Sequence, residues 1–440
     1  MLEKIFSWSK KKPHEEAEPF IQFGRYSDNN KSVVKVENWN MAEAMFKEKK
    51  YFESIKAFFE YLKDDETENV SHTQEGNKGR FQFYQGSKII NGKYDEKNFE
   101  AEAILAEMIQ PNVPVMRRLL EMNFNLYYSR YALEENKIVM LFNSDMITAN
   151  PSKLYYGLKE LATKADKQDD LLVQDFTTLT AVDTEHIIPL TEEEKAIKHK
   201  YFKKWIQEAL QIINEIDADK FSGGIAYLLL ALAYRLDYMI LPQGKLLYEL
   251  EKIVEIYFRK DDRPVTEKNQ EMADHYQKLL AKDKEEFYPY LFHSKYTFSI
   301  VTPQNIKTIA DAIYNANQNI NWYRENKLPV IAAQISEYGI SYCQYSYSLP
   351  RPLTELYHLM MMCNYPEYFR ELGFKDEFTS IETGKYNPEA IIAKIGEIEN
   401  RWRVKYPELK FKTEKLKFDN TVTFNQTFTV EIEFLNFETK

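Results

Sequence analysis

The chain has 440 residues, which is room for roughly two to four domains, and its 44% hydrophobic and 29% charged residues are ordinary for a globular protein. Its formal net charge of −10 argues against general nucleic-acid binding, because such binding depends on Lys and Arg side chains that neutralise phosphates. The two cysteines, Cys343 and Cys363, exclude a disulfide framework and favour a reducing cytoplasm.

The first 38 residues are predicted to form a tail. They contain no apolar run long enough for a signal peptide. A functional interpretation is a membrane-touching or partner-docking arm anchored by Ile5, Phe6 and Trp8. The favoured interpretation is a partly ordered terminus that packs a few aromatic side chains on the first domain. The most apolar run of the chain, 225–234, is followed by Arg235 and Asp237, so it predicts a buried helix and no transmembrane segment.

Residues 39–182 show the clearest alternation of helix and strand signals. Proline, glycine and capping residues mark most of the boundaries. The second of the middle helices is expected to bury Val115, Met116, Leu119 and Leu120. The predicted elements, in chain order, are a helix over 39–63, strands over 69–74, 80–85 and 88–94, helices over 99–109 and 115–122, strands over 124–131 and 138–142, and a helix over 151–179.

This element order resembles the type III secretion chaperone-like fold. The local run Pro-Val-Met-Arg-Arg-Leu-Leu-Glu-Met-Asn over 114–123, placed before an aromatic strand and an apolar strand, carries the resemblance. It is also similar to the related putative bacterial sensory-transduction regulator family. The resemblance covers about 39–182. It implies binding to other polypeptides through sheet and helix surfaces, often as dimers, without catalysis.

The remainder of the chain is predicted to be mainly helical. After a connector at 181–189, helices separated by short loops predict an all-α region over 190–407. The end, 408–440, alternates in a way typical of strands, with Phe428, Val430, Ile432 and Phe434 on one face. The fold class is therefore α+β, with an N-terminal chaperone-like α-β-β-β-α-β-β-α domain, an all-α helical region and a short C-terminal β-segment.

A candidate contact surface lies around two prolines, Pro350 and Pro352. Tyrosine and arginine are enriched at the centres of protein interfaces. A bland alternative is that half of these side chains fill the helical bundle and the others are scattered over the surface. The candidate partner-binding residues are Tyr342, Tyr345, Tyr347, Arg351 and Tyr357.

Motifs that carry chemistry are missing from the sequence. The seven histidines are scattered, and no phosphate loop, nucleophile elbow or dinucleotide fingerprint occurs. Asp166, Asp169 and Asp170 would lie on one side of a helix, where they could hold a hard cation. The neighbouring lysines favour a solvated, self-paired face instead. No catalytic residue, metal or cofactor is predicted.

The sequence thus favours a non-enzymatic, cytoplasmic, bacterial polypeptide-binding protein, chaperone-like or adaptor. Its expected partner is a polypeptide or a second copy of itself, with no nucleic acid. The alternative is an enzyme with an unrecognised carboxylate-based site, possibly metal-assisted at Asp166 to Asp170.

Overall fold

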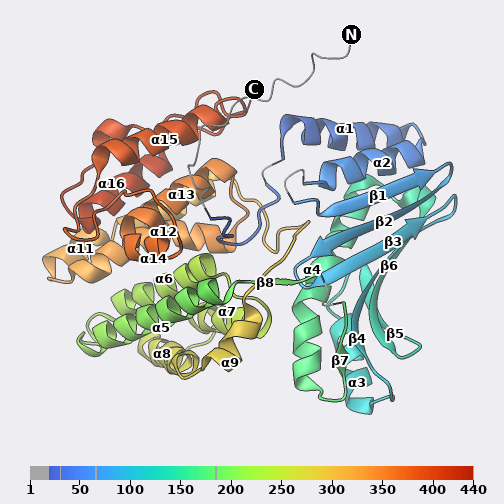
Figure 1. Ribbon diagram of the computed structural model, residues 1–440, viewed down its shortest axis with the longest axis horizontal. Coiled ribbons are helices and arrows are strands. Elements are labelled where there is room, and N and C mark those ends of the chain that lie inside the picture. Colours follow the sequence, from blue (N-terminus) through green and yellow to red (C-terminus); the bar gives the residue numbers. More distant parts are fainter. Residues whose placement is uncertain (1–18, 30, 65–66, 184–185, 440) are drawn as a thin grey trace, which may run out of the picture.

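The computed structural model describes residues 19–439 except 30, 65–66 and 184–185. It confirms the α+β class: 56% of the chain is helical and 14% is strand, with an antiparallel sheet of N-terminal strands followed by many helices. Figure 1 shows the sheet and its helices on one side and the helical region on the other. The predicted anchors Ile5, Phe6 and Trp8 lie outside the described residues.

The N-terminal half is a twisted sheet covered on one face by helices. Its strands run in the order β1-β2-β3-β4-β6-β5, each pair is antiparallel, and β7 pairs with β4. Buried residues of α2 and α4 meet Phe83, Phe99 and Phe142 of the strands in one core. The elements are α1 Val33–Lys47, α2 Tyr51–Leu62, β1 Val70–Glu75, β2 Lys78–Gln85, β3 Lys88–Tyr94, β4 Asn98–Glu107, α3 Val113–Asn123, β5 Ser129–Glu134, β6 Lys137–Asp145, α4 Pro151–Asp175 and β7 Thr180–Ala181.

The helix predicted over 99–109 was wrong, because these residues form β4 in the middle of the sheet. Phe99, Ala101 and Leu105 are buried in alternation with more exposed neighbours, as a strand requires. Alanine and glutamate favour a helix locally, but pairing with β3 and β6 on both sides overrides that preference. The helix predicted over 39–63 is two helices, α1 and α2, divided at Lys49, whose φ is +61°.

The helical half surrounds α6, which is buried along nearly its whole length. One apolar core extends from Leu190 to Leu435. Of the described helices, only α6 is long and apolar enough to cross a membrane, and 89% of its most apolar window is buried inside the structure. The longer helices are α5 Glu192–Asn214, α6 Ser222–Ile240, α7 Gly244–Phe258, α8 Val265–Leu280, α10 Ile306–Asn317, α12 Pro329–Ser346, α13 Arg351–Asn364, α15 Pro388–Trp402 and α16 Thr421–Glu433; the short ones are α9 Lys284–Phe287, α11 Ile320–Glu325 and α14 Pro366–Glu371.

The predicted C-terminal β-segment was wrong, because its central part is the helix α16. Asn420 caps this helix and forms a capping box with Thr423. Phe424, Phe428 and Ile432 are buried at four-residue steps against the rest of the helical core. Threonine and phenylalanine locally favour a strand. The contacts with the core override this preference, because they bury residues at the spacing of one side of a helix.

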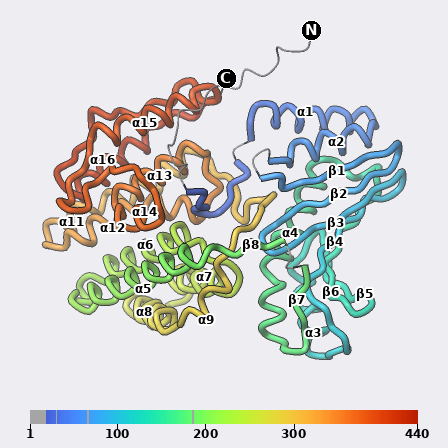
Figure 2. The backbone as a smooth tube through the Cα atoms, in the orientation of Figure 1, coloured from blue at the N-terminus to red at the C-terminus, as the bar shows by residue number. Residues whose placement is uncertain are grey.

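Two extended segments cross between the halves of the molecule, where Figure 2 shows them side by side. Ile21 and Phe23, predicted to be part of the tail, instead pack against the helical half, well before α1 begins at Val33. The segment after β9 (Phe292–His293) returns to the sheet, where Lys295 bridges Gly86 and Phe298 enters the N-terminal core. The two halves therefore share core residues.

Candidate functional site

The predicted tyrosine cluster is mostly used inside the helical half. Tyr357 is fully buried, and its hydroxyl lies 2.8 Å from that of Ser341. The ring of Tyr345 lies under the guanidinium of Arg25, 4.0 Å away, and 4.8 Å from the ring of Tyr234. The prediction that Tyr357 contacts a partner was wrong, because this side chain has no accessible surface.

The predicted contact residues other than Tyr357, Tyr345 included, keep part of their surface accessible. Tyr342 and Tyr347 are half-buried, with their hydroxyls 3.3 Å apart. Tyr342 also stacks with Tyr338 at 6.1 Å between ring centres. Arg351 is exposed at the first turn of α13. The five residues thus do not form one exposed surface.

The aspartates of α4 bind the turn between β2 and β3. Asp166 Oδ1 accepts hydrogen bonds from the Ser87 amide, at 2.8 Å, and from its hydroxyl, at 3.1 Å. Asp169 accepts from the same hydroxyl at 2.7 Å and pairs with Lys88 at 3.1 Å. Gly86 has φ +56°, and a Cβ there would lie 2.0 Å from Asp166, so only glycine allows this approach. Among the described residues, no group of three or more His, Cys, Asp or Glu side chains could hold a metal ion.

Burial and mutual repulsion change the acidity of these carboxyl groups. Burial, with the nearby Asp169 carboxylate, raises the pKa of Asp166 to about 7. The same two causes raise the pKa of Asp170 to about 7, although Lys88 opposes them. A cavity of about 40 Å³ lies beside Asp166, which is room for a water molecule. Both carboxyl groups are half-buried at the junction between the two halves.

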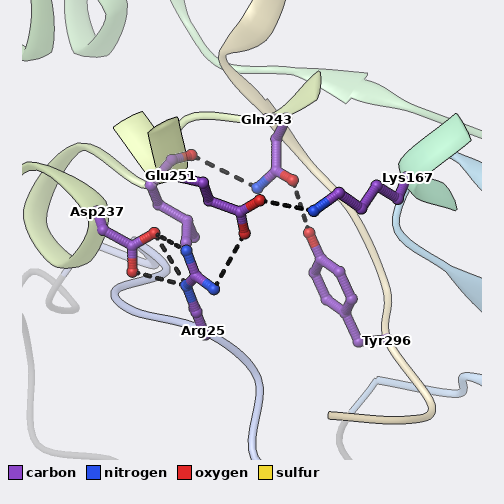
Figure 3. A network of polar contacts seen from close by, with 7 residues as sticks. Arg25, Lys167, Asp237, Gln243, Glu251 and Tyr296 are labelled. Carbon is purple, nitrogen blue, oxygen red and sulfur yellow. Dashed lines mark hydrogen bonds and ion pairs between the residues drawn. The ribbon is translucent and has the colours of Figure 1, made fainter. Parts of the chain in front are cut away.

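A second set of charges at this junction links four parts of the chain: the N-terminal segment and three helices (Figure 3). Arg25 donates two hydrogen bonds to Asp237 Oδ1, at 2.8 and 2.9 Å, and lies 3.3 Å from Glu251. Lys167 of α4 pairs with the other oxygen of Glu251 at 2.9 Å. Burial alone would lower the pKa of Arg25, but Asp237 raises it above its ordinary value, so the guanidinium stays charged. The network connects the N-terminal segment, α6, α7 and α4.

The outer face of the sheet is polar and open. A hollow of about 640 Å³ over it is lined by residues such as Arg80, Lys93 and Glu100. Lys93 pairs with Glu100 at 3.3 Å, and Gln82 donates to Asn91 at 2.9 Å. Charged side chains of opposite sign and polar side chains pair with one another here, as on the solvated face of many antiparallel sheets.

An apolar surface is exposed on α3. The helix buries Val115 and Leu119 in the N-terminal core but leaves other apolar side chains outside. Its exposed residues follow one another at three- and four-residue steps and so lie along one side. Leu120 is 66% and Phe124 89% exposed. We call this surface the α3 face; its members are Val113, Met116, Leu120 and Phe124. Figure 1 shows α3 at the lower end of the sheet, opposite α1.

Sequence reasoning missed the α3 face, since it placed Met116 and Leu120 in the core. The signal was nevertheless present: α3 has only 11 residues, and its apolar side chains form two stripes on different sides. One stripe fills the core. The second is left without a partner within the described part of the chain.

The loop after α3 is fixed although its aromatic side chains are exposed. Tyr127 is 92% exposed, yet its amide donates to Glu160 at 2.9 Å. The amides of Tyr128 and Ser129 donate to the same carboxylate, both at 2.8 Å, and the Ser129 hydroxyl at 2.7 Å. Burial alone would raise the pKa of Glu160, but these hydrogen bonds lower it below its ordinary value. The predicted strand over 124–131 therefore begins only at Ser129.

Beside this loop, the outer edge of β5 is closed by a side chain. The Asn123 amide oxygen accepts from the Tyr131 backbone amide at 2.7 Å, and its nitrogen donates to the Tyr131 carbonyl at 3.2 Å. The α3 face is thus set on a helix whose C-terminus is tied to the sheet.

No family model matches the chain and no curated protein matches it, so the chaperone-like fold stays a prediction from the sequence pattern.

Proposed function

We propose that this protein is a non-enzymatic polypeptide-binding protein, chaperone-like or adaptor in type, that docks its partner on the α3 face. The observation that carries the proposal is that Leu120 and Phe124 are largely exposed on a helix and loop held in place by Glu160 and Asn123. Exposed apolar side chains gathered on one element mark interaction sites. The resemblance to polypeptide-binding chaperones and the missing catalytic motifs support the same function, and we place it in the cytoplasm.

The fixed loop favours binding because it reduces the entropy lost on docking. A partner that meets an ordered surface does not have to order it first. Aromatic anchors such as Phe124 and Tyr127 also contribute large contact areas with few rotatable bonds.

The second candidate function is an enzyme that uses the Asp166 and Asp170 carboxyl groups. Their pKa values of about 7 support it, because groups that titrate near neutrality suit acid–base catalysis. The space beside Asp166, about 40 Å³, admits a water molecule but no substrate. The Asp166 carboxylate already accepts a hydrogen bond from the Ser87 amide. We therefore prefer the binding function.

The test is affinity capture of the tagged full-length protein from the cytoplasm of its own cells, with mass spectrometry. The variant M116S/L120S/F124S is expected to lose a stoichiometric partner that the wild type retains. The control is V404S, which removes a single apolar side chain that is 87% exposed elsewhere. A captured set that is the same for all three proteins would contradict the proposal.

A further inference from the structure

The two edges of the N-terminal sheet differ in how their backbone groups are used. β5 forms one edge, and its outward-facing amides at Ser129 and Tyr131 donate to side chains of α4 and α3. β1 forms the other edge and pairs only with β2. One edge is therefore closed by side chains, and the other requires a separate account.

The register of β1 with β2 shows which backbone groups of β1 point away from the sheet. The Tyr84 amide donates to the Asn69 carbonyl at 3.1 Å, just before β1 begins. Hydrogen-bonded pairs alternate along antiparallel strands, so every second residue after Asn69 faces β2. The N–H and C=O groups of Val70, His72 and Gln74 therefore point outward. No residue that the structure describes is hydrogen-bonded to these groups.

β1 also lacks the features by which edge strands avoid pairing with other strands. Such features are lysine or proline on the edge, a bulge, or a charged side chain that points inward. β1 has the sequence Val-Ser-His-Thr-Gln-Glu, and its register with β2 continues without a shift. Its one charged residue, Glu75, lies at the end of the strand, next to the turn. An uncharged strand with free outward groups suits pairing with a further strand.

We propose that β1 pairs with β1 of a second copy of this chain, antiparallel about a two-fold axis at His72, so that the two sheets join into one. Val70 then lies opposite Gln74 of the second copy, and Ser71 lies opposite its Thr73. The outward backbone groups of each strand meet those of the other. This dimer goes beyond the proposed function and does not use the α3 face, which Figure 1 shows at the opposite end of the sheet from β1.

The side chains of β1 fit this pairing. Ser71 and Thr73 are exposed, and their hydroxyls can hydrogen-bond across the pair of strands. The two copies of His72 meet at the axis. Burial lowers the pKa of His72 to about 4, so both imidazoles are uncharged at neutral pH and do not repel one another.

The charges on α2 favour a second copy over an unrelated strand. Lys56, Glu60 and Lys63 lie close enough to the edge residue His72 to influence its pKa. Glu53 extends this stripe by a three-residue step, so acids and bases alternate along it. Such an order is complementary to itself in reverse. Where two α2 helices meet antiparallel, Lys56 faces Glu60 of the second copy and Glu53 faces Lys63.

The proposed dimer closes on itself. Because side chains occupy the outward amides of β5, the joined sheet offers no second open edge from which a fibre could grow. The net charge of −10 on each chain opposes self-contact only weakly, because exposed charges more than about 10 Å apart are largely screened by salt. The α2 stripe itself has no net charge.

The test is the mass of the full-length protein, measured by size-exclusion chromatography with light scattering over a range of concentrations. The wild type is expected to approach twice the mass of one chain. S71K/T73K sets lysines opposite lysines of the second copy and should raise the dimer Kd by about tenfold or more. S71E/T73K is the matched control, since it sets each lysine opposite a glutamate and should dimerise as the wild type does. Both positions are exposed, so both variants should fold.

A second pair of variants tests the contact between the α2 helices without changing β1. Lys56→Glu sets like charges against each other across the axis and should raise the dimer Kd by roughly tenfold, the effect of two exposed ion pairs. K56E/E60K exchanges the two signs and should restore most of the affinity.

Each contrary result overturns the dimer in a different way. A wild type that stays monomeric at every concentration excludes it, and a dimer that S71K/T73K leaves intact lies elsewhere on the chain. Loss of the dimer in S71E/T73K as well would contradict the antiparallel register. The α3 face is tested separately: S71K/T73K should still capture the wild-type partner, and M116S/L120S/F124S should still dimerise. Loss of the dimer in the latter variant alone would identify α3, and not β1, as the contact between copies.

Discussion

Carboxyl groups in this protein show how the surroundings of a single residue decide its charge. Glu160 receives three backbone amides and a hydroxyl, so its pKa falls. Asp166 also receives an amide and a hydroxyl, but it is half-buried beside the Asp169 carboxylate, and its pKa rises to about 7. Donated hydrogen bonds stabilise the charged form, whereas burial and a like charge oppose it. The first group anchors a presented loop, and the second lies at an internal junction.

Replacing Glu160 tests whether this anchor holds the loop beside the α3 face. We expect Glu160→Ala to lower the free energy of unfolding by about 1–3 kcal/mol, because three amides lose a charged acceptor. Hydrogen exchange at residues 127–129 should become faster. Because the folded pKa lies below the ordinary value, the contribution is present at neutral pH and is lost as pH falls through the folded pKa.

The control for this loop is Glu121→Ala, since Glu121 is exposed on α3. It should leave exchange at 127–129 unchanged. Equal exchange in the Glu160→Ala variant and the wild type would mean that the carboxylate does not order the loop.

A second prediction concerns the pH dependence of stability at Asp166 and Asp170. Their folded pKa values, about 7, lie above the ordinary 3.8, so the folded protein binds more protons between these values. Their contribution to stability is complete below pH 3.8 and is lost as pH rises through 7. The variant D166N/D170N should therefore gain stability over the wild type at pH 8 relative to pH 5, measured by urea unfolding at both values. A constant difference between the proteins would contradict the raised pKa values.

At the scale of elements, the sequence correctly predicts the helices and strands whose local preference agrees with their tertiary contacts. The region predicted to be helical over 190–407 holds the helices α5 to α15, and capping residues, prolines and glycines mark the ends of many of them. Two elements were predicted as the wrong type: β4 as a helix and α16 as a strand. Ala101 and Ala103 of β4 suggest a helix, but sheet pairing on both sides decides otherwise. Thr427 and Thr429 of α16 suggest a strand, but burial against α10 and α12 decides otherwise.

The candidate site was less predictable than the fold, for a related reason. Tyr357 was predicted at the surface but is fully buried, whereas Leu120 was predicted in the core but is 66% exposed. Composition shows that a side chain suits an interface, but only packing shows whether it faces a partner or the protein's own core. A short helix with two apolar stripes leaves that choice open.

Two phenylalanines in α16 distinguish the helix from the predicted strand. Phe428 and Phe434 would share one face of a strand, six residues apart. In the structure Phe428 is fully buried, whereas Phe434 is 67% exposed after the helix ends. Phe428→Ala should lower the free energy of unfolding by about 3–5 kcal/mol. Phe434→Ala should change it by less than about 0.5 kcal/mol in chemical denaturation. Equal losses would favour the strand.

At the scale of the whole molecule, the two halves are held together by segments that sequence order does not place side by side. The N-terminal segment brings Phe23 against Tyr238 and His358 of the helical half. A few residues later, Asp28 accepts hydrogen bonds from Tyr155 of α4 and from Ser299, both at 2.6 Å. One short segment therefore contacts both halves and the extended segment after β9 that returns between them. Such contacts link residues more than a hundred positions apart, so local sequence patterns could not reveal them.

Arg25 is the charged centre of this junction, and its removal should uncouple the halves. Its side chain is 8% exposed and that of Asp237 is 4% exposed, so Arg25→Met leaves a buried carboxylate without its partner. We expect a loss of about 3–5 kcal/mol in the free energy of unfolding, because an unpaired buried charge is costly. The double variant R25M/D237N should recover much of this loss, since it removes the charge that was left. Hydrogen exchange should show faster opening in residues 19–29 and in α7 of the single variant, with the central strands β3 and β4 protected. If the double variant were no more stable than the single one, the shape of Arg25 against Tyr345, rather than its charge, would be what joins the halves.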